Sequence, residues 1–398
     1  MSDTISIVGP TDTVVNPGQR SQAVTMPAEA RRSTVLPRLQ WNGPVPTATP
    51  TSRVRFEELG TLGRGGMGEV VLAKDHDIER TVAIKRLTEQ QDLGLLMRFV
   101  DEIRIVGSLE HPNIVPVHDV GVDEGGRYYF VMKHLRGDSL ESIIEKLKAG
   151  DQAMHQRFPF HVRVQVFIGV LNAMAYAHQQ GIIHRDLKPA NIMVGPYGEV
   201  TVMDWGLARN LATKSEAIPL ASVREGTLLQ TQAGAVMGTP LYMSPEQARG
   251  EQDKLDVRSD VYALAVVFHE FLYLEHYLGS LEAMPEILAA VQSTTPKMFD
   301  MKQSPHQPGV PAELGWFLLK GFEKDPAKRF QNVTEMIAAM QQIVDGRVNV
   351  QCERTFAKRM LQEAIHRADA HPKTVIIGTG LVLSFVLAGL VNSFMTFF

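Results

Sequence analysis

A glycine-rich segment between two strand-like runs restricts the fold of this chain more than any other feature. Residues 63–70 read GRGGMGEV, with apolar runs at residues 56–62 and 70–73 on either side. A dinucleotide-binding loop shares the first six positions of this pattern, but it follows a strand and opens a helix. Two flanking strands instead predict an antiparallel hairpin whose glycine amides can approach phosphate groups without interference from side chains. An ordinary glycine turn would give the same local pattern, so this segment alone does not decide between the two.

The segments that follow predict a small antiparallel sheet with one helix. Three more strand-like runs cover residues 81–85, 114–120 and 128–132. Residues 95–109 place their apolar side chains on one face of a helix. Beyond Gly137 the helical signal dominates, and the expected helices cover residues 162–178, 257–274, 316–322 and 333–343. A sheet followed by helices predicts an α+β fold.

A lysine near the end of a buried strand needs a partner for its charge. Residues 82–85 read VAIK, so Lys85 follows three apolar residues, and a buried charge without a partner is costly. Glu102 can supply the partner, because it lies on the apolar face of the helix at residues 95–109, whereas Asp101 points outward. The alternative is that Glu102 is an ordinary solvated helix residue.

Composition and charge exclude several classes of protein. The chain has 398 residues, 44% of them hydrophobic, which is enough for a sizeable core. Its net charge of −4 gives no global basic field, so nucleic acid is not expected as a partner. Cys352 is the single cysteine. This excludes a disulfide within the chain and a zinc site built on several thiolates.

The two ends of the chain differ from the middle. Residues 1–54 are rich in Pro, Thr, Ser and Gly and predict a disordered arm without a secretory signal. Residues 374–398 carry no charge and would span roughly 37 Å as a helix, enough for a hydrocarbon core of about 30 Å. A charged connector at residues 346–373 precedes this expected transmembrane helix. Its basic residues predict that everything before the span is cytoplasmic.

Three further motifs occur in order along the chain. Residues 184–191 read HRDLKPAN, residues 204–206 read DWG, and GTP at 238–240 comes shortly before SPE at 244–246. Together with GRGGMGEV and VAIK, this set resembles the eukaryotic-type, or Hanks-type, protein kinase family over about residues 56–345. The resemblance implies a bilobal fold, with a sheet-containing N-lobe at about residues 55–134 and a mainly helical C-lobe at about 135–345.

The motifs match the chemistry of phosphoryl transfer, which requires positioning and neutralisation of oxygen charge. Asp186 would accept or orient the proton of the substrate hydroxyl, and Lys188 would stabilise charge at the γ-phosphate. Asn191 and Asp204 would hold magnesium, with manganese as an alternative. By the resemblance, the residues that form the ATP site are Leu62, Gly63, Gly65, Gly66, Gly68, Val70, Ala83, Lys85, Glu102, Met132, Lys133, Leu135 and Met193.

The resemblance also implies supporting roles for six residues near the catalytic segment. It implies that His184 packs beneath the metal loop and that Arg185 pairs with a phosphorylated residue. Thr239 would contact the catalytic loop. Asp260 would accept backbone hydrogen bonds from that loop, and Glu246 would pair with Arg329.

One branch assignment, one departure and two expected phosphorylation sites follow from the same motifs. Lys188 with Pro189 is similar to the serine/threonine branch of the family. Trp205 replaces the usual phenylalanine, which keeps the metal ligand but could bias the loop between two conformations. In the long segment from Asp204 to Glu246, Thr231 is the leading expected autophosphorylation site and Thr227 the second.

The sequence therefore predicts an ATP-dependent serine/threonine protein kinase at the cell membrane, with its catalytic domain in the cytoplasm. Protein substrates and membrane lipid are the expected partners. Homodimerisation is a hypothesis carried by a stripe of small residues at Gly380, Ser384 and Ala388. A pseudokinase or scaffold is the alternative, although every catalytic residue is present. A dinucleotide oxidoreductase is disfavoured, because no strand–loop–helix unit contains the glycine motif.

Overall fold

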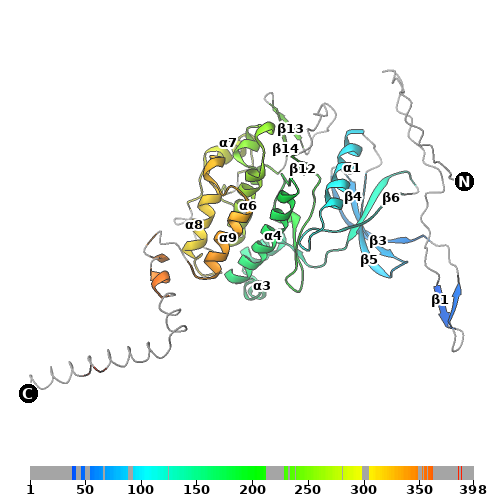
Figure 1. Ribbon diagram of the computed structural model, residues 1–398, viewed down its shortest axis with the longest axis horizontal. Helices are drawn as coiled ribbons and strands as arrows, with labels where there is room; N and C mark the ends of the chain where they lie inside the picture. The colour runs from blue at the N-terminus through cyan, green and yellow to red at the C-terminus, as the bar shows by residue number, and fades with distance from the viewer. Residues whose placement is uncertain are drawn as a thin grey trace, which may run out of the picture.

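The computed structural model describes most of the expected catalytic region. The described ranges are residues 54–65, 68–87, 93–123, 125–211, 239–279, 281–297 and 304–347, together with four short strands and scattered positions from 352 to 387. They form a sheet-containing N-lobe and a larger helical C-lobe, which lie side by side in Figure 1. The prediction of an α+β fold with these two lobes is confirmed for this region.

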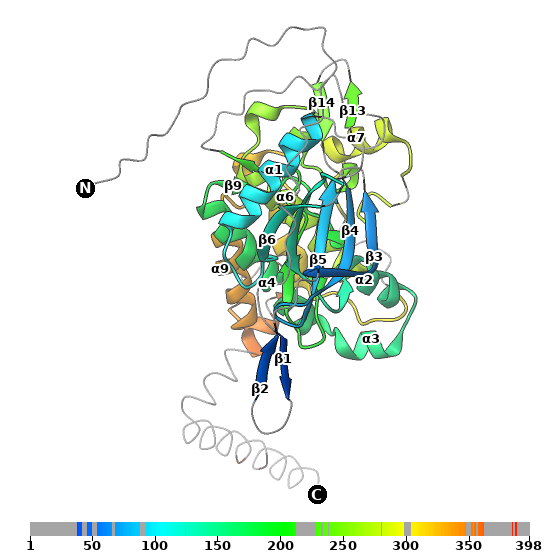
Figure 2. The ribbon, with the colours of Figure 1, turned by 90° about the vertical axis from the view of Figure 1, so that its right-hand side faces the viewer.

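The N-lobe is a five-stranded antiparallel sheet with one helix. Its strands are β3 (Phe56–Gly65), β4 (Gly68–Asp75), β5 (Arg80–Leu87), β6 (Val117–Val122) and β7 (Tyr128–Lys133). Their order is β3-β4-β5-β7-β6, and Figure 2 shows β3, β4 and β5 side by side. One face of the sheet buries Val71, Val82 and Val131 together. Helix α1 (Leu93–Ser108) inserts Phe99 between Leu87 and Phe130 on the other face.

The strand expected at residues 114–120 begins later than the sequence suggests. Strand β6 starts at Val117, whereas Ile114 forms an isolated parallel bridge with Val202 of the C-lobe. The Val115 N–H also donates to the Val202 carbonyl at 3.2 Å, and both Ile114 and Val115 are buried. The apolar run is therefore real, but its first part belongs to the junction between the lobes.

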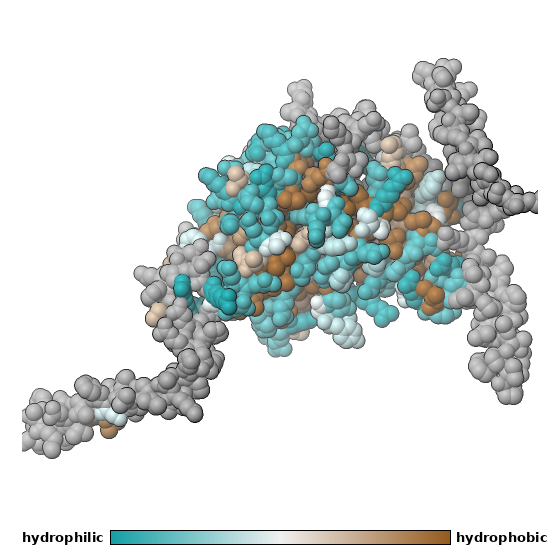
Figure 3. Space-filling model, viewed as in Figure 1, coloured by the Kyte–Doolittle hydropathy of each residue, from teal (hydrophilic) through white to brown (hydrophobic). Residues whose placement is uncertain are grey.

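Two long helices form the centre of the C-lobe. Helix α4 (Phe160–Gln179) packs against α6 (Val257–Tyr273), and the rings of Phe167 and Phe268 stack at 4.0 Å. Helix α6 ends where Leu274 adopts a left-handed conformation with φ 60°. The surrounding helices are α2 (Leu140–Lys148), α3 (Gln152–Arg157), α5 (Pro245–Ala248), α7 (Met284–Ser293), α8 (Ala312–Gly321) and α9 (Val333–Val344). Polar side chains cover much of the face shown in Figure 3, with apolar patches between them.

Short strands hold the loops that carry the expected catalytic residues. Strands β8 (Asp138–Ser139), β10 (Ile192–Val194) and β11 (Val200–Val202) form one small sheet in the order β11-β10-β8. Strands β9 (Ile182–Ile183) and β12 (Arg209–Asn210) form a second. The catalytic segment lies between β9 and β10, and the DWG segment lies between β11 and β12. The chain between each pair of strands is thus fixed at both ends.

Regular structure occurs inside the arm that was predicted to be disordered. Strands β1 (Arg38–Trp41) and β2 (Pro46–Thr49) form an antiparallel pair, with Trp41 opposite Pro46. Short runs of this kind can pair locally even in a Pro- and Thr-rich sequence. The disordered arm over residues 1–54 stays a prediction. A second pair, β13 (Leu228–Thr231) and β14 (Gly234–Met237), lies in the segment after the DWG motif.

The expected membrane span falls almost entirely outside the described residues and remains a prediction. Among the residues that the structure does describe, α4 is the helix long and apolar enough to cross a membrane. Half of its apolar stretch is buried inside the domain. We therefore interpret α4 as the central core helix of the C-lobe.

Candidate active site

Strand register brings four of the expected ATP-site residues onto one face of the N-lobe sheet. Lys85 of β5 is opposite Val70 of β4, and Ala83 of β5 is opposite Met132 of β7. Side chains directly opposite each other, and those two residues apart on one strand, share a face. Val70, Ala83, Lys85 and Met132 therefore form a continuous surface.

Lys85 connects that surface to both a helix and the metal loop. Its ammonium Nζ lies 2.5 Å from Glu102 Oε1 on α1 and 3.4 Å from Asp204 Oδ1. The expected ion pair between Lys85 and Glu102 is thus present in the structure. It forms because Glu102 lies one helical turn after Phe99, whose side chain anchors α1 to the sheet.

Burial and charge act in opposite directions on these three groups. Burial lowers the pKa of Lys85, but the carboxylates of Glu102 and Asp204 outweigh this effect and raise it overall. Burial raises the pKa of Glu102, which is 3% exposed. Burial also opposes ionisation of Asp204, but the nearby charge of Lys85 prevails and holds the pKa of Asp204 below its usual range. Asp204 is therefore ionised, and its side chain is 42% exposed.

Asp186 lies at the centre of a group of donors. Its Oδ1 accepts from the Thr239 backbone N–H at 2.8 Å and from the Thr239 hydroxyl at 2.9 Å. Its Oδ2 lies 2.8 Å from Lys188 Nζ, which also donates to the Thr239 hydroxyl at 2.9 Å. The expected contact between Thr239 and the catalytic loop is therefore present. Asp186, Lys188 and Thr239 form a closed triangle of polar contacts.

Asn191 joins the catalytic loop to the position where a metal would bind. Its side-chain Nδ2 donates to the Asp186 carbonyl at 2.9 Å, which leaves the amide oxygen of Asn191 to act as a ligand. Asn191 and Asp204 thus offer the hard oxygen donors that magnesium prefers. Among the described residues there is no group of three or more His, Cys, Asp or Glu side chains suited to a metal. A cation held here would draw the rest of its ligands from phosphates and water.

Asp260, at the start of α6, fixes the backbone of the catalytic loop. Its carboxylate accepts from the backbone N–H groups of His184 and Arg185, both at 2.9 Å. It is also 2.8 Å from His178 Nε2. Hydrogen bonds of this kind stabilise a non-glycine residue in the left-handed region, and Arg185 has φ 69°. Asp204 has a similar φ of 59°.

The DWG departure is accommodated in the core. Trp205 is completely buried, and its ring lies 4.6 Å from that of His184. His184 Nε2 lies 3.3 Å from the Met203 carbonyl, directly before Asp204. His184 therefore packs beneath the metal loop, as the resemblance implied, and the indole supports Asp204 from below.

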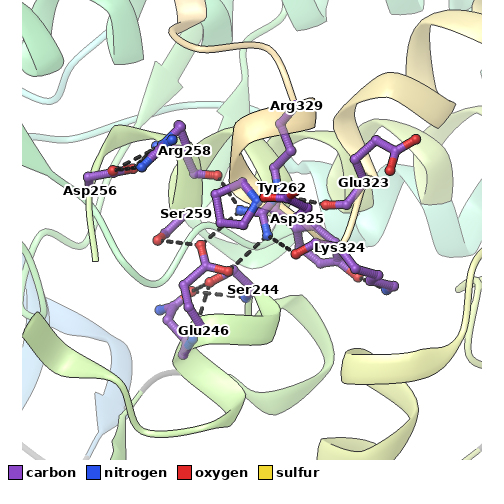
Figure 4. A network of polar contacts seen from close by, with 12 residues as sticks. Ser244, Glu246, Asp256, Arg258, Ser259, Tyr262, Glu323, Lys324, Asp325 and Arg329 are labelled. Carbon is purple, nitrogen blue, oxygen red and sulfur yellow. Dashed lines mark hydrogen bonds and ion pairs between the residues drawn. The ribbon is translucent and has the colours of Figure 1, made fainter. Parts of the chain in front are cut away.

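A buried ion pair fixes the far end of the segment that begins at Asp204. Arg329 donates from two nitrogens to the two carboxylate oxygens of Glu246, each at 2.8 Å, and Ser259 donates to one of them at 2.8 Å (Figure 4). The expected pair of Glu246 and Arg329 is present. The neighbouring residue Gln247 donates to the Arg185 carbonyl at 2.9 Å. This end of the segment is thereby tied to the catalytic loop.

Arg185 lies near two other arginines and near the Asp260 carboxylate. Its side chain donates to Gln252 Oε1 at 3.1 Å. Its pKa is lowered to about 10, mainly by burial and secondarily by the nearby guanidinium of Arg209. Arg98 of α1 acts in the same direction. Three arginines from separate elements therefore create a local positive potential beside the catalytic loop.

The remaining expected ATP-site residues are less closely constrained. Leu62 is 51% exposed on β3, Leu135 packs partly against the main core, Lys133 is exposed, and Met193 lies within β10. A Cβ at Gly63 or Gly65 would meet nothing within 4 Å, whereas a Cβ at Gly68 would lie 2.1 Å from the Arg86 carbonyl oxygen. Gly68 is therefore required by strand packing. Gly66 lies outside the described residues.

Sequence reasoning missed several residues that build the site. His178 contacts Asp260, Gln247 contacts Arg185, and the Tyr242 hydroxyl donates to Glu270 at 2.6 Å. None belongs to a motif whose residues are adjacent in sequence. The only local signal was the S-x-x-Q pattern at residues 244–247, which forms a capping box at the start of α5.

Comparison with known proteins agrees with this geometry. The protein kinase domain family matches residues 56–343. The serine/threonine-protein kinase PknD of Protochlamydia amoebophila is 33% identical over 312 residues, which cover 76% of this chain and 31% of that protein. PknB of Mycobacterium leprae is 35% identical over 306 residues, 75% of this chain and 44% of that protein. PknB of Mycolicibacterium smegmatis is 36% identical over 299 residues, 73% of this chain and 43% of that protein.

The matched region is the two-lobed domain described above. The chain spans less than half the length of these curated relatives. The family match over residues 56–343 includes all the motifs from GRGGMGEV to SPE. The family match covers well over half of the chain. The chain therefore belongs to the protein kinase domain family, where it is similar to bacterial serine/threonine-protein kinases.

Proposed function

We propose that this chain is an active serine/threonine protein kinase that transfers the γ-phosphate of ATP to hydroxyl groups of proteins. The triangle of Asp186, Lys188 and Thr239 is the observation that carries this proposal. In this triangle, the Asp186 carboxylate and the Lys188 ammonium both contact Thr239, which belongs to the segment before SPE. A scaffold without catalysis would have no need to hold an ionisable carboxylate against both.

Asp186 orients the substrate hydroxyl and accepts its proton. The Thr239 backbone and hydroxyl hold Oδ1 of this carboxylate, so the other oxygen, next to Lys188, faces the reaction. Lys188 lies 2.8 Å from that oxygen and neutralises charge that develops on the transferred phosphoryl group. Preorganised donors of this kind are the main source of rate enhancement in phosphoryl transfer.

Lys85 and the metal loop hold the nucleotide in this proposal. Lys85, oriented by Glu102, binds the α- and β-phosphates, and adenine lies against the surface of Val70, Ala83 and Met132. Asp204 and Asn191 hold a divalent cation, for which we propose magnesium, with manganese as an alternative. The bound cation would neutralise phosphate charge.

We assign autophosphorylation to Thr231, and to Thr227 as the second site. The backbone of Thr231 forms the end of β13, whereas Thr227 lies outside the described residues. The positive potential of Arg98, Arg185 and Arg209 favours binding of a phosphate group. Mass spectrometry of the purified chain, with Asp186→Asn as control, tests the assignment. Unmodified Thr227 and Thr231 in the active protein would reject it.

The proposal for the membrane rests on the sequence after residue 373. We infer that residues 374–398 form a transmembrane helix that contacts lipid and leaves the kinase domain in the cytoplasm. The proposed homodimer would form through Gly380, Ser384 and Ala388. Recovery of the full chain in the soluble fraction after alkaline carbonate extraction would refute the span. Crosslinking of the double variant Gly380→Leu, Ser384→Leu tests the dimer, which the substitutions are expected to weaken.

A phosphotransfer assay tests the activity itself. Wild type is incubated with magnesium ATP and myelin basic protein as the acceptor, beside Lys85→Met and Asp186→Asn. We expect transfer by the wild type and its loss in both variants. Lys328→Met is the matched control, because Lys328 is exposed in the same lobe. If the wild type binds ATP but transfers no phosphate, the chain is a nucleotide-binding scaffold.

A further inference from the structure

Lys324 is a half-buried lysine outside every motif found in the sequence. It lies between α8 and the short 3-10 helix Pro326–Lys328. Its ammonium donates to the Tyr262 hydroxyl at 2.6 Å and to the Val291 carbonyl at 2.8 Å. Among the described residues, no carboxylate forms an ion pair with it. An ammonium held by neutral oxygens in this way needs an explanation.

Each contact of Lys324 stabilises a different helix of the C-lobe. Val291 is in the last turn of α7, where carbonyl groups lack partners within the helix, so the ammonium caps that helix and complements its dipole. Tyr262 belongs to α6, and its hydroxyl lies 2.9 Å from that of Tyr277. Lys324 thus ties α7 to α6, and its Nζ also lies over the Tyr277 ring, 5.5 Å from its centre.

The same tyrosine ring connects Lys324 to the buried ion pair. The Arg329 guanidinium lies over the Tyr262 ring, 5.0 Å from its centre, and Figure 4 shows Lys324, Tyr262 and Arg329 around Glu246. Arg329 Nη2 also donates to the Lys324 carbonyl at 3.2 Å. Movement of Lys324 is therefore coupled to the anchor of the SPE segment.

Helix α7 in turn supports the segment that borders Asp186. Val291 and Ile287 of α7 pack with Ala248 and Leu278, and Leu241 and Tyr277 lie against this cluster. Leu241 is in the 3-10 helix Pro240–Tyr242, which begins directly after Thr239. Thr239 donates to Asp186. A shift of α7 would therefore move residues 239–242 relative to the catalytic loop, where a protein substrate binds.

We propose that Lys324 is a positioning residue for the protein-substrate side of the active site, acting through α7 and Tyr277 on residues 239–242. This inference rests on the proposed kinase function. It predicts that loss of the ammonium impairs binding of the protein substrate and leaves ATP binding nearly unchanged, because Lys324 reaches neither Lys85 nor the glycine-rich hairpin.

The electrostatic environment of Lys324 agrees with a role beyond filling space. Its pKa is lowered to about 8, mainly by burial and secondarily by the charge of Arg329. A hydrophobic side chain at such a position avoids the cost of burying a charge. What the ammonium provides, and a hydrophobic side chain would not, is a pair of hydrogen bonds to acceptors on two different helices.

Steady-state kinetics of Lys324→Met test the proposal. Methionine keeps the length of the stem but loses both hydrogen bonds. We expect the KM for myelin basic protein to rise about fivefold or more, while the KM for ATP stays within about twofold. Lys324→Arg, which keeps a cation and its donors, should restore most of the difference. Lys328→Met in the same loop is the matched control and should match the wild type.

Amide hydrogen exchange gives a readout that does not need activity. We expect faster exchange in α7 and residues 239–242 of Lys324→Met, with the N-lobe unchanged. Equal rises in both KM values, or a lower melting temperature without faster local exchange, would overturn the proposal. If the methionine variant does not fold, Lys324→Gln and Lys324→Arg are compared by the same criteria. A wild type without transfer would refute the kinase function, and hydrogen exchange would still judge the role of Lys324.

Discussion

Two buried glutamates, each paired with a cation, hold the two lobes of this molecule in different ways. In the C-lobe, both oxygens of Glu246 accept from Arg329, and Ser259 adds a third hydrogen bond. In the N-lobe, Glu102 contacts Lys85 through one oxygen, and its other oxygen is buried without a partner among the described residues. Lys85 is also shared with Asp204.

The protonation behaviour of the two carboxyl groups differs accordingly. Burial opposes the charge of both. At Glu246 the hydrogen bonds and charge of Arg329 prevail and lower the pKa, whereas at Glu102 burial prevails and raises it. The C-lobe pair is a satisfied, static anchor. The N-lobe pair is incompletely satisfied, which suits a site whose lysine must also meet a ligand.

Arg329→Ala should give the largest loss of stability, because it leaves the buried Glu246 carboxylate without its partner. Removing one member of a buried pair costs about 3–5 kcal/mol. Chemical denaturation measures the change. Arg258→Ala is the control, since Arg258 pairs with Asp256 at the surface and such pairs contribute about 1 kcal/mol or less. Similar losses in both variants would contradict a special role for the buried pair.

Lys85→Met should lower phosphotransfer by about 10²–10³-fold, as loss of one positioned donor does elsewhere. Its effect on the free energy of unfolding should be smaller than that of Arg329→Ala, because Glu102 already has a raised pKa and can bind a proton when the ammonium is gone. Lys74→Met in the adjacent strand serves as control. A loss of stability as large as in Arg329→Ala would show that the two pairs are equivalent after all.

Gly68→Ala should destabilise the N-lobe by about 1–3 kcal/mol, because two backbone segments must separate to admit the methyl group. The new Cβ would lie 2.1 Å from the Arg86 carbonyl oxygen. Gly63→Ala, with open space around its Cβ, should change the free energy of unfolding by less than about 0.5 kcal/mol. Thermal denaturation measures the melting temperature of both variants. A decrease for Gly68→Ala alone would show that the strand pair at Gly68 is rigid. Equal melting temperatures would argue against a rigid strand pair at Gly68.

The smallest expected effect is a change in the acid limb of the stability curve. The lowered pKa of Glu246 means that its contribution is complete above the usual glutamate value of 4.5 and is lost as the pH falls below it. The raised pKa of Glu102 has the opposite effect on stability. Its contribution is complete below pH 4.5 and is lost as the pH rises from there through the raised pKa of the folded state. Glu246→Gln should therefore flatten the acid limb and Glu102→Gln should steepen it. Urea unfolding at a series of pH values measures both slopes. Changes of the same sign would contradict the comparison.

The N-lobe pair could be predicted from the sequence because its information is local. The helical period that buries Phe99 also places Glu102 on the inner face, and VAIK reads as a strand. The two strands around the glycine segment gave the hairpin in the same way. Local periodicity failed at Ile114, whose apolar run contributes to the junction of the lobes.

The C-lobe site depends on contacts between residues far apart in the chain. The partners of Asp260 and Glu246 were expected only because the motifs resemble a known family. His178 and Lys324 belong to no motif, and their partners lie 82 and 62 residues away in the sequence. No pattern within one helix can reveal such contacts, since only the packing of α4, α6 and α8 brings them together.

The dependence of the catalytic loop on Asp260 has a consequence for protein synthesis. Arg185 takes up its left-handed conformation where the Asp260 carboxylate receives its N–H, and Asp260 follows 75 residues later in the chain. A ribosome therefore releases the whole catalytic loop well before the carboxylate that orders it. We expect nascent chains that end before α6 to lack an assembled active site. Phosphorylation by this chain would then begin only after the C-lobe has been translated.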